Sequence, residues 1–167
     1  MYNILVVDDD KENISMHIFN NKVLFKYKNI IFLSRLIGGT YPVTSNIIPK
    51  NFNIDIECDF NDIYDMIDRA SLLTSDKDKN TIKLVLENKQ LIISSNSPEI
   101  GKVEEKIAID NASSISISFS SKYMLEAIKS FNSEKIHLLM NNDNSPIIVK
   151  SDSEESLTQL VLPIKTY

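Results

Sequence analysis

The amino-acid sequence predicts an α+β fold built from a strand–helix–strands unit that occurs twice. Hydrophobic and polar residues alternate at residues 54–58, and a segment with helical hydrophobic spacing follows directly, before further short segments with strand-like alternation. The same order of elements begins again at residue 115. Repeated strands and helices joined by short polar turns are typical of an α+β domain with one hydrophobic core.

The first unit opens with a strand whose side chains at Ile54, Ile56 and Cys58 lie on one face. Asp59 is positioned to accept hydrogen bonds from the first free amide groups of a helix. The hydrophobic residues of this helix recur at helical spacing: Phe60, Ile63, Tyr64, Ile67 and Ala70. We expect the helix to end at residues 74–76, a polar turn at 87–89, and strands at 81–86, 90–94 and 102–109.

The second unit repeats this pattern with a strand at residues 115–119. Ser120 or Ser121 is expected to cap the helix that follows. The hydrophobic residues of that helix segment are Tyr123, Met124, Ala127, Ile128 and Phe131. Strands are predicted at residues 135–140, 147–150 and 157–163, which completes the repeat.

The N-terminal part of the chain has a different pattern. Residues 14–19, 23–27 and 30–36 are predicted to be consecutive short strands joined by polar turns, with no helix between them. They look like the back half of a repeat unit whose first strand and helix are missing. Gly38, Gly39 and Pro42 interrupt the pattern, and we place the domain boundary near Pro49, which gives domains 1–49 and 50–167.

Composition excludes several classes of function. The formal net charge of −5 argues against tight, sequence-independent binding of nucleic acid over the whole surface. The three glycines leave no glycine-rich phosphate loop. No hydrophobic run approaches the length of a membrane span, so we expect a cytoplasmic protein without a membrane partner.

No catalytic, metal or cofactor site is predicted. Cys58 is the only cysteine, and its place in a half-buried strand predicts a buried, unreactive thiol. His17 and His137 lie far apart in predicted strands, without other residues at metal-ligand spacing. We therefore expect a protein that is not an enzyme.

Asp8, Asp9 and Asp10 follow a hydrophobic run, and they leave one alternative open. The phosphoacceptor domain of a response regulator begins in this way, because its clustered carboxylates hold a divalent cation. Against this, no later strand ends in an aspartate followed by Met-Pro, and strands stand where alternating helices are required. A strand with a solvated acidic turn explains the residues more simply.

Several short stretches of the sequence occur in the order and spacing of one known family. They are residues 32–37, 41–42, 48–49, 68–73, 91–99, 119–125, 145–146 and 160–164. With them the chain resembles the C-terminal part of the bacterial DNA polymerase sliding clamp, the beta subunit of DNA polymerase III. No single stretch is diagnostic, but the ordered set is specific and extends from about residue 14 to the end of the chain.

The resemblance implies the DNA-clamp fold, in which repeated strand–helix–strands units form a ring around DNA. Residues 50–167 would be the complete third domain of a clamp chain, and residues 1–49 the back half of its middle domain. The implied function is that of a processivity factor in DNA replication. Such a ring encircles duplex DNA irrespective of sequence and tethers polymerase and other partners through a peptide pocket, with no cofactor.

The resemblance also implies roles for individual residues. The pocket for partner peptides would comprise Pro42, Ile47, Ser120, Tyr123, Leu160, Val161, Leu162, Pro163 and Ile164. Leu72 and Leu73 would lie at the contact that closes the ring between subunits; because they are adjacent, only one can lie at the centre of a helix face. The residues facing DNA would be Lys77, Lys79, Lys122 and Lys129. Asn46 and Ser120 depart from the residues that the family usually has at these positions.

The alternatives within this family stay open at the level of sequence. The chain could be a working part of a clamp that joins other clamp chains. It could also be a stand-alone peptide-binding module, or a degenerate remnant of a clamp.

Overall fold

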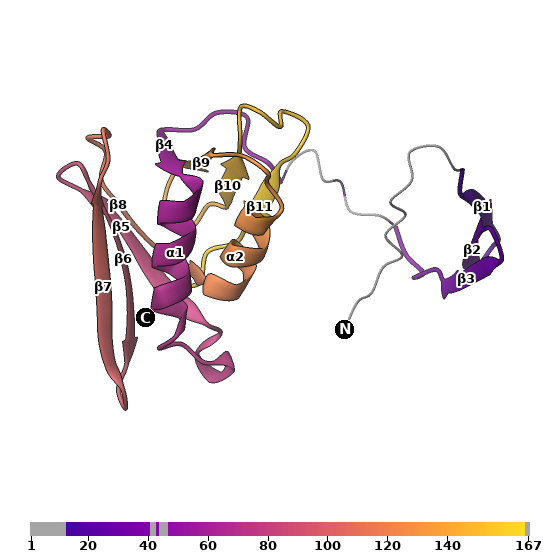
Figure 1. Ribbon diagram of the computed structural model, residues 1–167, viewed down its shortest axis with the longest axis horizontal. Coiled ribbons are helices and arrows are strands. Elements are labelled where there is room, and N and C mark those ends of the chain that lie inside the picture. The colour runs from indigo at the N-terminus through magenta and orange to yellow at the C-terminus, as the bar shows by residue number, and fades with distance from the viewer. Residues whose placement is uncertain (1–12, 41–42, 44–46, 166–167) are drawn as a thin grey trace. The chain divides into compact units, whose positions relative to one another are not determined.

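The computed structural model describes residues 13–40, 43 and 47–165. The chain divides into two units, Met1–Val43 and Thr44–Tyr167, which are described separately here as the small and the large unit (Figure 1). The division between Val43 and Thr44 lies N-terminal to the predicted boundary near Pro49. The hydrophobic run that ends in Asp8–Asp10 lies outside the described residues.

The small unit is a three-stranded antiparallel meander of β1 (Ser15–Ile18), β2 (Lys22–Tyr27) and β3 (Ile30–Arg35). All three strands lie where the sequence predicts them. Phe25 pairs directly with Phe32, and their ring centres are 6.1 Å apart. Lys28, in the tight turn between β2 and β3, has a left-handed φ of 51°, as such hairpin turns require.

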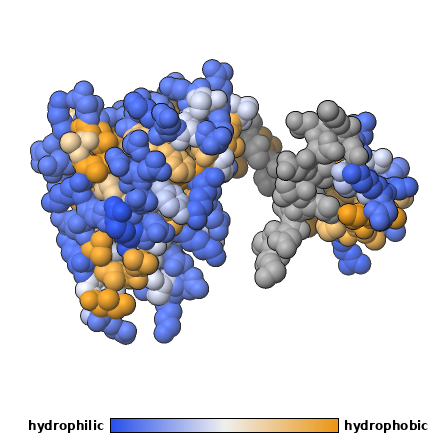
Figure 2. Space-filling view, in the orientation of Figure 1, coloured by the Kyte–Doolittle hydropathy of each residue, from blue (hydrophilic) through white to orange (hydrophobic). Residues whose placement is uncertain are grey.

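One face of this sheet carries large hydrophobic side chains that are not buried. Met16, Phe25 and Phe32 lie opposite one another across the three strands and therefore share this face. Met16 and Phe32 are 57% and 47% exposed, and no described residue of the small unit is buried. Hydrophobic residues are visible on the surface of this unit (Figure 2).

The large unit contains both predicted repeats. The first consists of β4 (Ile54–Asp59), α1 (Phe60–Ser71), a short 3-10 helix η2 (Asp76–Asp78), β5 (Thr81–Glu87), β6 (Gln90–Ser97) and β7 (Gly101–Ala108). The second consists of β8 (Ile115–Ser120), α2 (Ser121–Lys129), β9 (Lys135–Met140), β10 (Ile147–Lys150) and β11 (Gln159–Val161). The order of elements confirms the sequence prediction, with η2 as an addition between the predicted helix and strand.

The two repeats exchange their first strands. The sheets have the orders β11-β10-β9-β4 and β7-β6-β5-β8, so β4 of the first repeat pairs with the second, and β8 of the second pairs with the first. The registers bring Ile56 opposite Leu138 and Leu84 opposite Ile117. Neither sheet is complete without both repeats, so the large unit must fold as one body.

The helices α1 and α2 pack against each other and against the sheets (Figure 1). Their inward residues, which include Ile63, Ile67, Met124 and Ile128, are buried in one hydrophobic core with the inner faces of both sheets. Met66 is also buried, and the predicted hydrophobic face of the first helix had not included it. Each Å² of apolar surface that such a core removes from water stabilises the domain by about 25 cal/mol.

The two helices begin differently. The Asp59 carboxylate accepts hydrogen bonds from the amides of Asn61 (2.9 Å) and Asp62 (3.2 Å), which confirms the predicted cap of α1. Ser120 is the N-cap residue of α2, but its hydroxyl makes no capping hydrogen bond. The Ser121 amide instead donates to the Asn80 carbonyl (2.8 Å), which ties the start of α2 to the turn before β5.

Tyr123, one of the hydrophobic residues of the second predicted helix, is 62% exposed, because the buried face of α2 is formed by Ser121, Met124, Ala127 and Ile128. One prediction about the second repeat was wrong. The last strand was predicted at residues 157–163, but β11 ends at Val161. Pro163, which has no amide hydrogen, follows it with only an isolated bridge to Phe119.

Candidate functional site

A groove of about 610 Å³ lies where the C-terminal segment of the large unit meets the start of α2 and the turn before β5. Three segments line it. The lining residues are Asp76, Lys79 and Asn80, then Ser120, Lys122 and Tyr123, then Leu160, Val161, Leu162, Pro163 and Ile164. The groove is therefore bounded by residues that are distant in the sequence and brought together by the fold.

The C-terminal segment is fixed along the edge of β8. Val161 pairs with Ile147 of β10 and is only 4% exposed, which anchors the segment in the core. Farther along, the Ile164 amide donates a hydrogen bond of 2.7 Å to the Ser118 carbonyl. Between these anchors Leu162 is 64% exposed, so the backbone is held while this side chain faces solvent.

Tyr123 supplies the second exposed hydrophobic group of the groove. It lies in the first turn of α2, outside the buried face of that helix. Tyr123 and Leu162 thus present two large, exposed side chains to one groove, beside the half-buried Leu160 and Ile164. Contiguous exposed hydrophobic surface of this kind marks sites where another molecule binds.

The turn before β5 forms the polar rim. Lys79 and Asn80 both have left-handed backbone conformations, with φ of 55° and 50°. The Asn80 carbonyl accepts from the amide and the hydroxyl of Ser121 (2.8 and 3.1 Å), and its side-chain amide donates to Asp76 (2.8 Å). These bonds fix the rim relative to α2.

The structure brings together most residues predicted for the peptide pocket. Ser120 and Tyr123 line the groove together with the five residues 160–164. Ile47, which is 46% exposed, is not among the lining residues, and Pro42 lies outside the described part of the chain.

Sequence reasoning missed the polar rim. It assigned Lys79 and Lys122 to a DNA-facing surface, whereas both line the groove, and it assigned no role to Asp76 or Asn80. The tolerance of asparagine for left-handed backbone could have marked the turn at Asn80. The contact with α2 joins residues that are 41 positions apart, and no local pattern reports that.

Residues 45–165 match the family described as DNA polymerase III beta subunit, C-terminal domain. The chain belongs to this family, that of the bacterial sliding clamps. The beta sliding clamp of Staphylococcus aureus is 39% identical over 164 residues, which are 97% of this chain and 44% of that protein. The resemblance drawn from the sequence is therefore confirmed.

Solved structures of clamps show the same fold. The DNA polymerase sliding clamp from Bacillus subtilis matches with a TM-score of 0.82 and 39% identity, over 95% of this chain and 43% of that one. The DNA polymerase III beta chain from Streptococcus pneumoniae matches with a TM-score of 0.79 and 32% identity, over 92% and 41%. The chain thus has the clamp fold and spans less than half the length of these relatives.

Leu72 and Leu73, predicted to close a clamp ring, lie at the end of α1. Leu72 is 74% exposed and Leu73 is half-buried, so Leu72 is the one available to a partner. The helix end is fixed, because the Arg69 guanidinium donates to both carboxylate oxygens of Glu105 on β7 (2.6 and 2.7 Å). This hydrogen-bonded contact raises the pKa of Arg69 and lowers that of Glu105.

The remaining lysines predicted to face DNA, Lys77 and Lys129, are not among the residues that line the groove. Lys77 is exposed in η2, and the ammonium group of Lys129 lies 5.2 Å from the centre of the Tyr64 ring. The neighbouring Tyr64 side chain raises the pKa of Lys129. The exposed side of α1 is acidic, with Asp62, Asp65 and Asp68.

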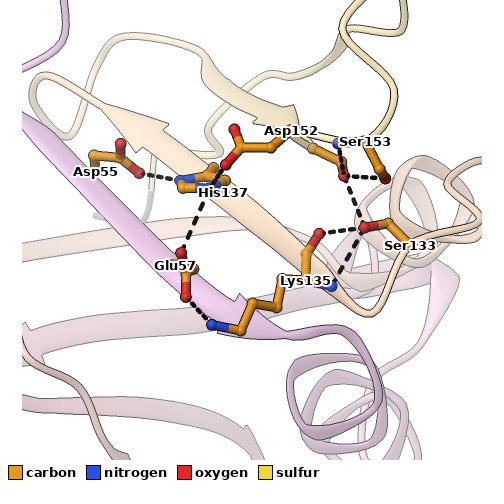
Figure 3. A network of polar contacts seen from close by, with 8 residues as sticks. Asp55, Glu57, Ser133, Lys135, His137, Asp152 and Ser153 are labelled. Atoms are coloured by element: carbon orange, nitrogen blue, oxygen red, sulfur yellow. Dashed lines mark hydrogen bonds and ion pairs between the residues drawn. The ribbon is translucent and has the colours of Figure 1, made fainter.

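A second polar cluster surrounds His137 on β9 (Figure 3). Its Nδ1 lies 2.8 Å from the Asp55 carboxylate, and its Nε2 lies 3.6 Å from Asp152 and 3.9 Å from Glu57. Burial lowers the pKa of His137, but the hydrogen bond to Asp55 and the three negative charges outweigh it and raise the pKa. Among the residues that the structure describes, no group of His, Cys, Asp and Glu side chains is placed to hold a metal ion.

Cys58 is buried on β4, as the sequence predicts, and is 3% exposed. Burial raises the pKa of its thiol to about 12, so the nucleophilic thiolate is scarce at neutral pH.

Across the described ranges of the chain, no helix is both long and apolar enough to cross a membrane.

Proposed function

We propose that this chain is a docking part of a replication processivity factor. Its groove binds short peptide segments of polymerase and other replication proteins, and so ties them to a clamp on duplex DNA. The observation that carries the proposal is the exposure of Tyr123 and Leu162 in a groove whose backbone is held in place on every side. Membership of the sliding-clamp family supports it.

The chemistry of the groove suits a peptide with hydrophobic anchors and a glutamine. Leu160, Leu162 and Ile164 offer apolar surface, which supplies most of the binding free energy in such complexes. Ser120 and Asn80 offer polar groups that fix the register of the peptide. We propose that the chain acts by binding alone, as a non-catalytic subunit.

Residues 50–167 would serve as the third domain of a clamp chain, and residues 1–49 as the back half of a middle domain. Leu72, exposed at the end of α1, would contact another clamp subunit in the ring. Lys77 and Lys129 would contact phosphates, which position a protein on DNA without reading its sequence. Because the exposed side of α1 is acidic, we expect weak binding of duplex DNA by this chain alone.

Fluorescence anisotropy with a labelled peptide that carries a glutamine and hydrophobic anchors tests the groove. We expect saturable binding by the wild type. Tyr123→Ala and Leu162→Ala should each weaken it at least tenfold, because each removes an exposed anchor contact without touching the core. Ile100→Ala is the matched control, since Ile100 is 70% exposed but does not line the groove.

The absence of wild-type binding, or equal loss in all three variants, would contradict the proposal. A mixing experiment then separates a working part of a ring from a stand-alone module. Association with a full-length clamp that is lost in Leu72→Asp supports a ring part. Peptide binding without any such association supports a stand-alone module, and neither activity would indicate a remnant.

A further inference from the structure

The described part of the small unit contains no negatively charged side chain. Among residues 13–40 and 43, the charged residues are Lys22, Lys26, Lys28 and Arg35. The carboxylates of residues 1–12 lie outside the described part of the chain. The formal net charge of the whole chain is −5, so β1, β2 and β3 form a basic sheet within an acidic chain.

Three of these cations lie on one face of the sheet. Lys22 on β2 is directly opposite Arg35 on β3, so the two side chains share a face. Lys26 follows Lys22 by four residues on the same strand and therefore points to the same side. At about 3.3 Å per residue, the Cα atoms of Lys22 and Lys26 lie roughly 13 Å apart. The phenylalanines of the strands, Phe25 and Phe32, lie on the other face.

Hydrophobic residues fill the space between the cations. Leu24 lies midway between Lys22 and Lys26, and Leu33 is directly opposite Leu24. Leu33 is 55% exposed, and Ile31, opposite Lys26, is 63% exposed. We call this surface the basic face; it comprises Lys22, Leu24, Lys26, Ile31, Leu33 and Arg35. A hydrophobic centre with a polar border is the usual anatomy of a protein interface.

The cations of the basic face have no counter-charge in the described part of the chain. Neither Lys22, Lys26 nor Arg35 forms an ion pair with any residue that the structure describes. The ammonium group of Lys22 lies 5.4 Å from the centre of the Phe19 ring instead. Like charges directly opposite each other destabilise a sheet, and Lys22 and Arg35 are such a pair.

Exposed lysines on the sheets of the large unit are placed differently. Lys106 on β7 lies 3.0 Å from the Glu104 carboxylate of the same strand. Lys89, in the turn after β5, lies 2.9 Å from the Asp110 carboxylate. The large unit thus neutralises these charges within itself, whereas the basic face would gain most from negative charges on another molecule.

We propose that the basic face binds a segment of a partner protein in which two acidic residues flank a hydrophobic one, with the spacing Glu-x-Leu-x-Glu. In an extended segment alternate side chains point to the same side, so its two carboxylates lie roughly 13 Å apart, as the two lysines of β2 do. The leucine between them then meets Leu24 and Leu33. This surface lies in the small unit, so the inference is independent of the proposed docking groove.

The hydrophobic centre favours a protein segment over a nucleic acid. A phosphate backbone could pair with Lys22, Lys26 and Arg35, but it offers no hydrophobic group to Leu24 and Leu33. Proteins that bind single-stranded nucleic acid stack bases on aromatic side chains, and the basic face has none.

Fluorescence anisotropy with two labelled peptides tests the proposal. They contain Glu-Ser-Leu-Ser-Glu or Gln-Ser-Leu-Ser-Gln and are otherwise identical. We expect the wild type to bind the acidic peptide about three- to tenfold more tightly, as a few exposed ion pairs allow. The preference should shrink as salt is raised, because exposed charges are screened. It should vanish when Lys22, Lys26 and Arg35 are all changed to Gln.

Two further variants locate the binding site. Changing Lys50, Lys77 and Lys83 to Gln removes the same net charge from exposed positions of the large unit and should leave the preference intact. Leu162→Ala, in the groove, should also leave it intact. Leu33→Ser should weaken binding of both peptides by a similar factor, because it removes hydrophobic contact and no charge.

Equal binding of the two peptides by the wild type, or binding of neither, would overturn the proposal. A preference that survives the triple change on the basic face would do the same. Loss of the preference in Leu162→Ala would place the peptide in the groove and overturn the basic face as its site. Binding of a labelled oligothymidine strand that depends on the three cations, without any peptide preference, would assign the face to nucleic acid instead.

Discussion

The small and the large unit are built from strands of similar pattern, yet the hydrophobic core that the structure describes lies in the large unit. Every buried hydrophobic residue that the structure describes lies between Ile54 and Val161, in the large unit. In the small unit, Met16, Phe25 and Phe32 line up across three strands and stay at least partly exposed. Alternation makes a sheet with a hydrophobic face, but a second layer is required to bury that face.

The large unit supplies that second layer from within itself. Two helices cover the sheets, and each repeat lends its first strand to the sheet of the other. In the small unit no residue that the structure describes is buried, so little apolar surface is removed from water to stabilise its sheet. We therefore expect the two units to differ in stability. Two experiments test that difference, and a third measures how one polar cluster contributes to the stability of the large unit.

Hydrogen exchange should show the largest effect. β2 and β9 are both central strands, hydrogen-bonded on both sides, so they form a matched pair. Only β9 is buried, and its amides should exchange about a thousandfold more slowly than those of β2, because they open only when the core unfolds. Equal protection in the two strands would mean that the small unit is stable without a cover.

Truncation of one phenylalanine in each unit should show a smaller difference. Phe119 is fully buried, and Phe119→Ala should lower the free energy of unfolding of the large unit by about 3–5 kcal/mol. Phe32→Ala is the counterpart in the small unit and should cost about 1 kcal/mol or less, because Phe32 is 47% exposed. Urea unfolding followed by circular dichroism measures both, and similar costs would contradict the contrast.

The pH dependence at His137 should be the smallest effect. Its pKa is raised above the ordinary value of 6.5, so the folded state binds the proton more tightly than the unfolded state does. The resulting stabilisation is complete below pH 6.5 and is lost as the pH rises through the raised pKa. The urea midpoint of the large unit should therefore fall between about pH 6 and pH 8.

Asp55→Asn is the control for this effect. It removes the negative charge that lies 2.8 Å from Nδ1 of His137 and should flatten the dependence on pH in this range. Asp110→Asn, a change at an exposed aspartate paired with Lys89, should leave the dependence as it is in the wild type. A midpoint that does not change with pH in the wild type would contradict the role of His137.

Much of the fold could be predicted because it depends on neighbouring residues. The N-terminal cap of α1 needs only a side-chain hydrogen-bond acceptor two or three residues before the free backbone amides of the helix. Asp59 provides this acceptor, as predicted. The left-handed turn at Asn88 and Lys89 follows from the short polar link between two alternating segments. Repetition of these local signals predicted both units of the repeat.

Only part of the candidate site could be predicted from the sequence. The hydrophobic run at residues 160–164 is visible in the sequence, and the family resemblance assigned it to a pocket. Only the family resemblance assigned Tyr123 to the pocket, because helical spacing places it beside Met124 and does not show where the buried face of the helix ends. Nor could spacing show that Lys79 and Lys122 share one rim.

The sequence by itself therefore determined the helices and strands, their order and the repeat. Capping and turn hydrogen bonds join near neighbours, and the helical and strand-like spacings of hydrophobic residues are also local properties of the chain. Only the tertiary structure decided that β4 and β8 change places between the repeats, and that a turn, a helix start and a C-terminal segment enclose one groove. These pairings join residues far apart in the chain. They are chosen by the burial of a shared core, and that choice depends on all the elements at once.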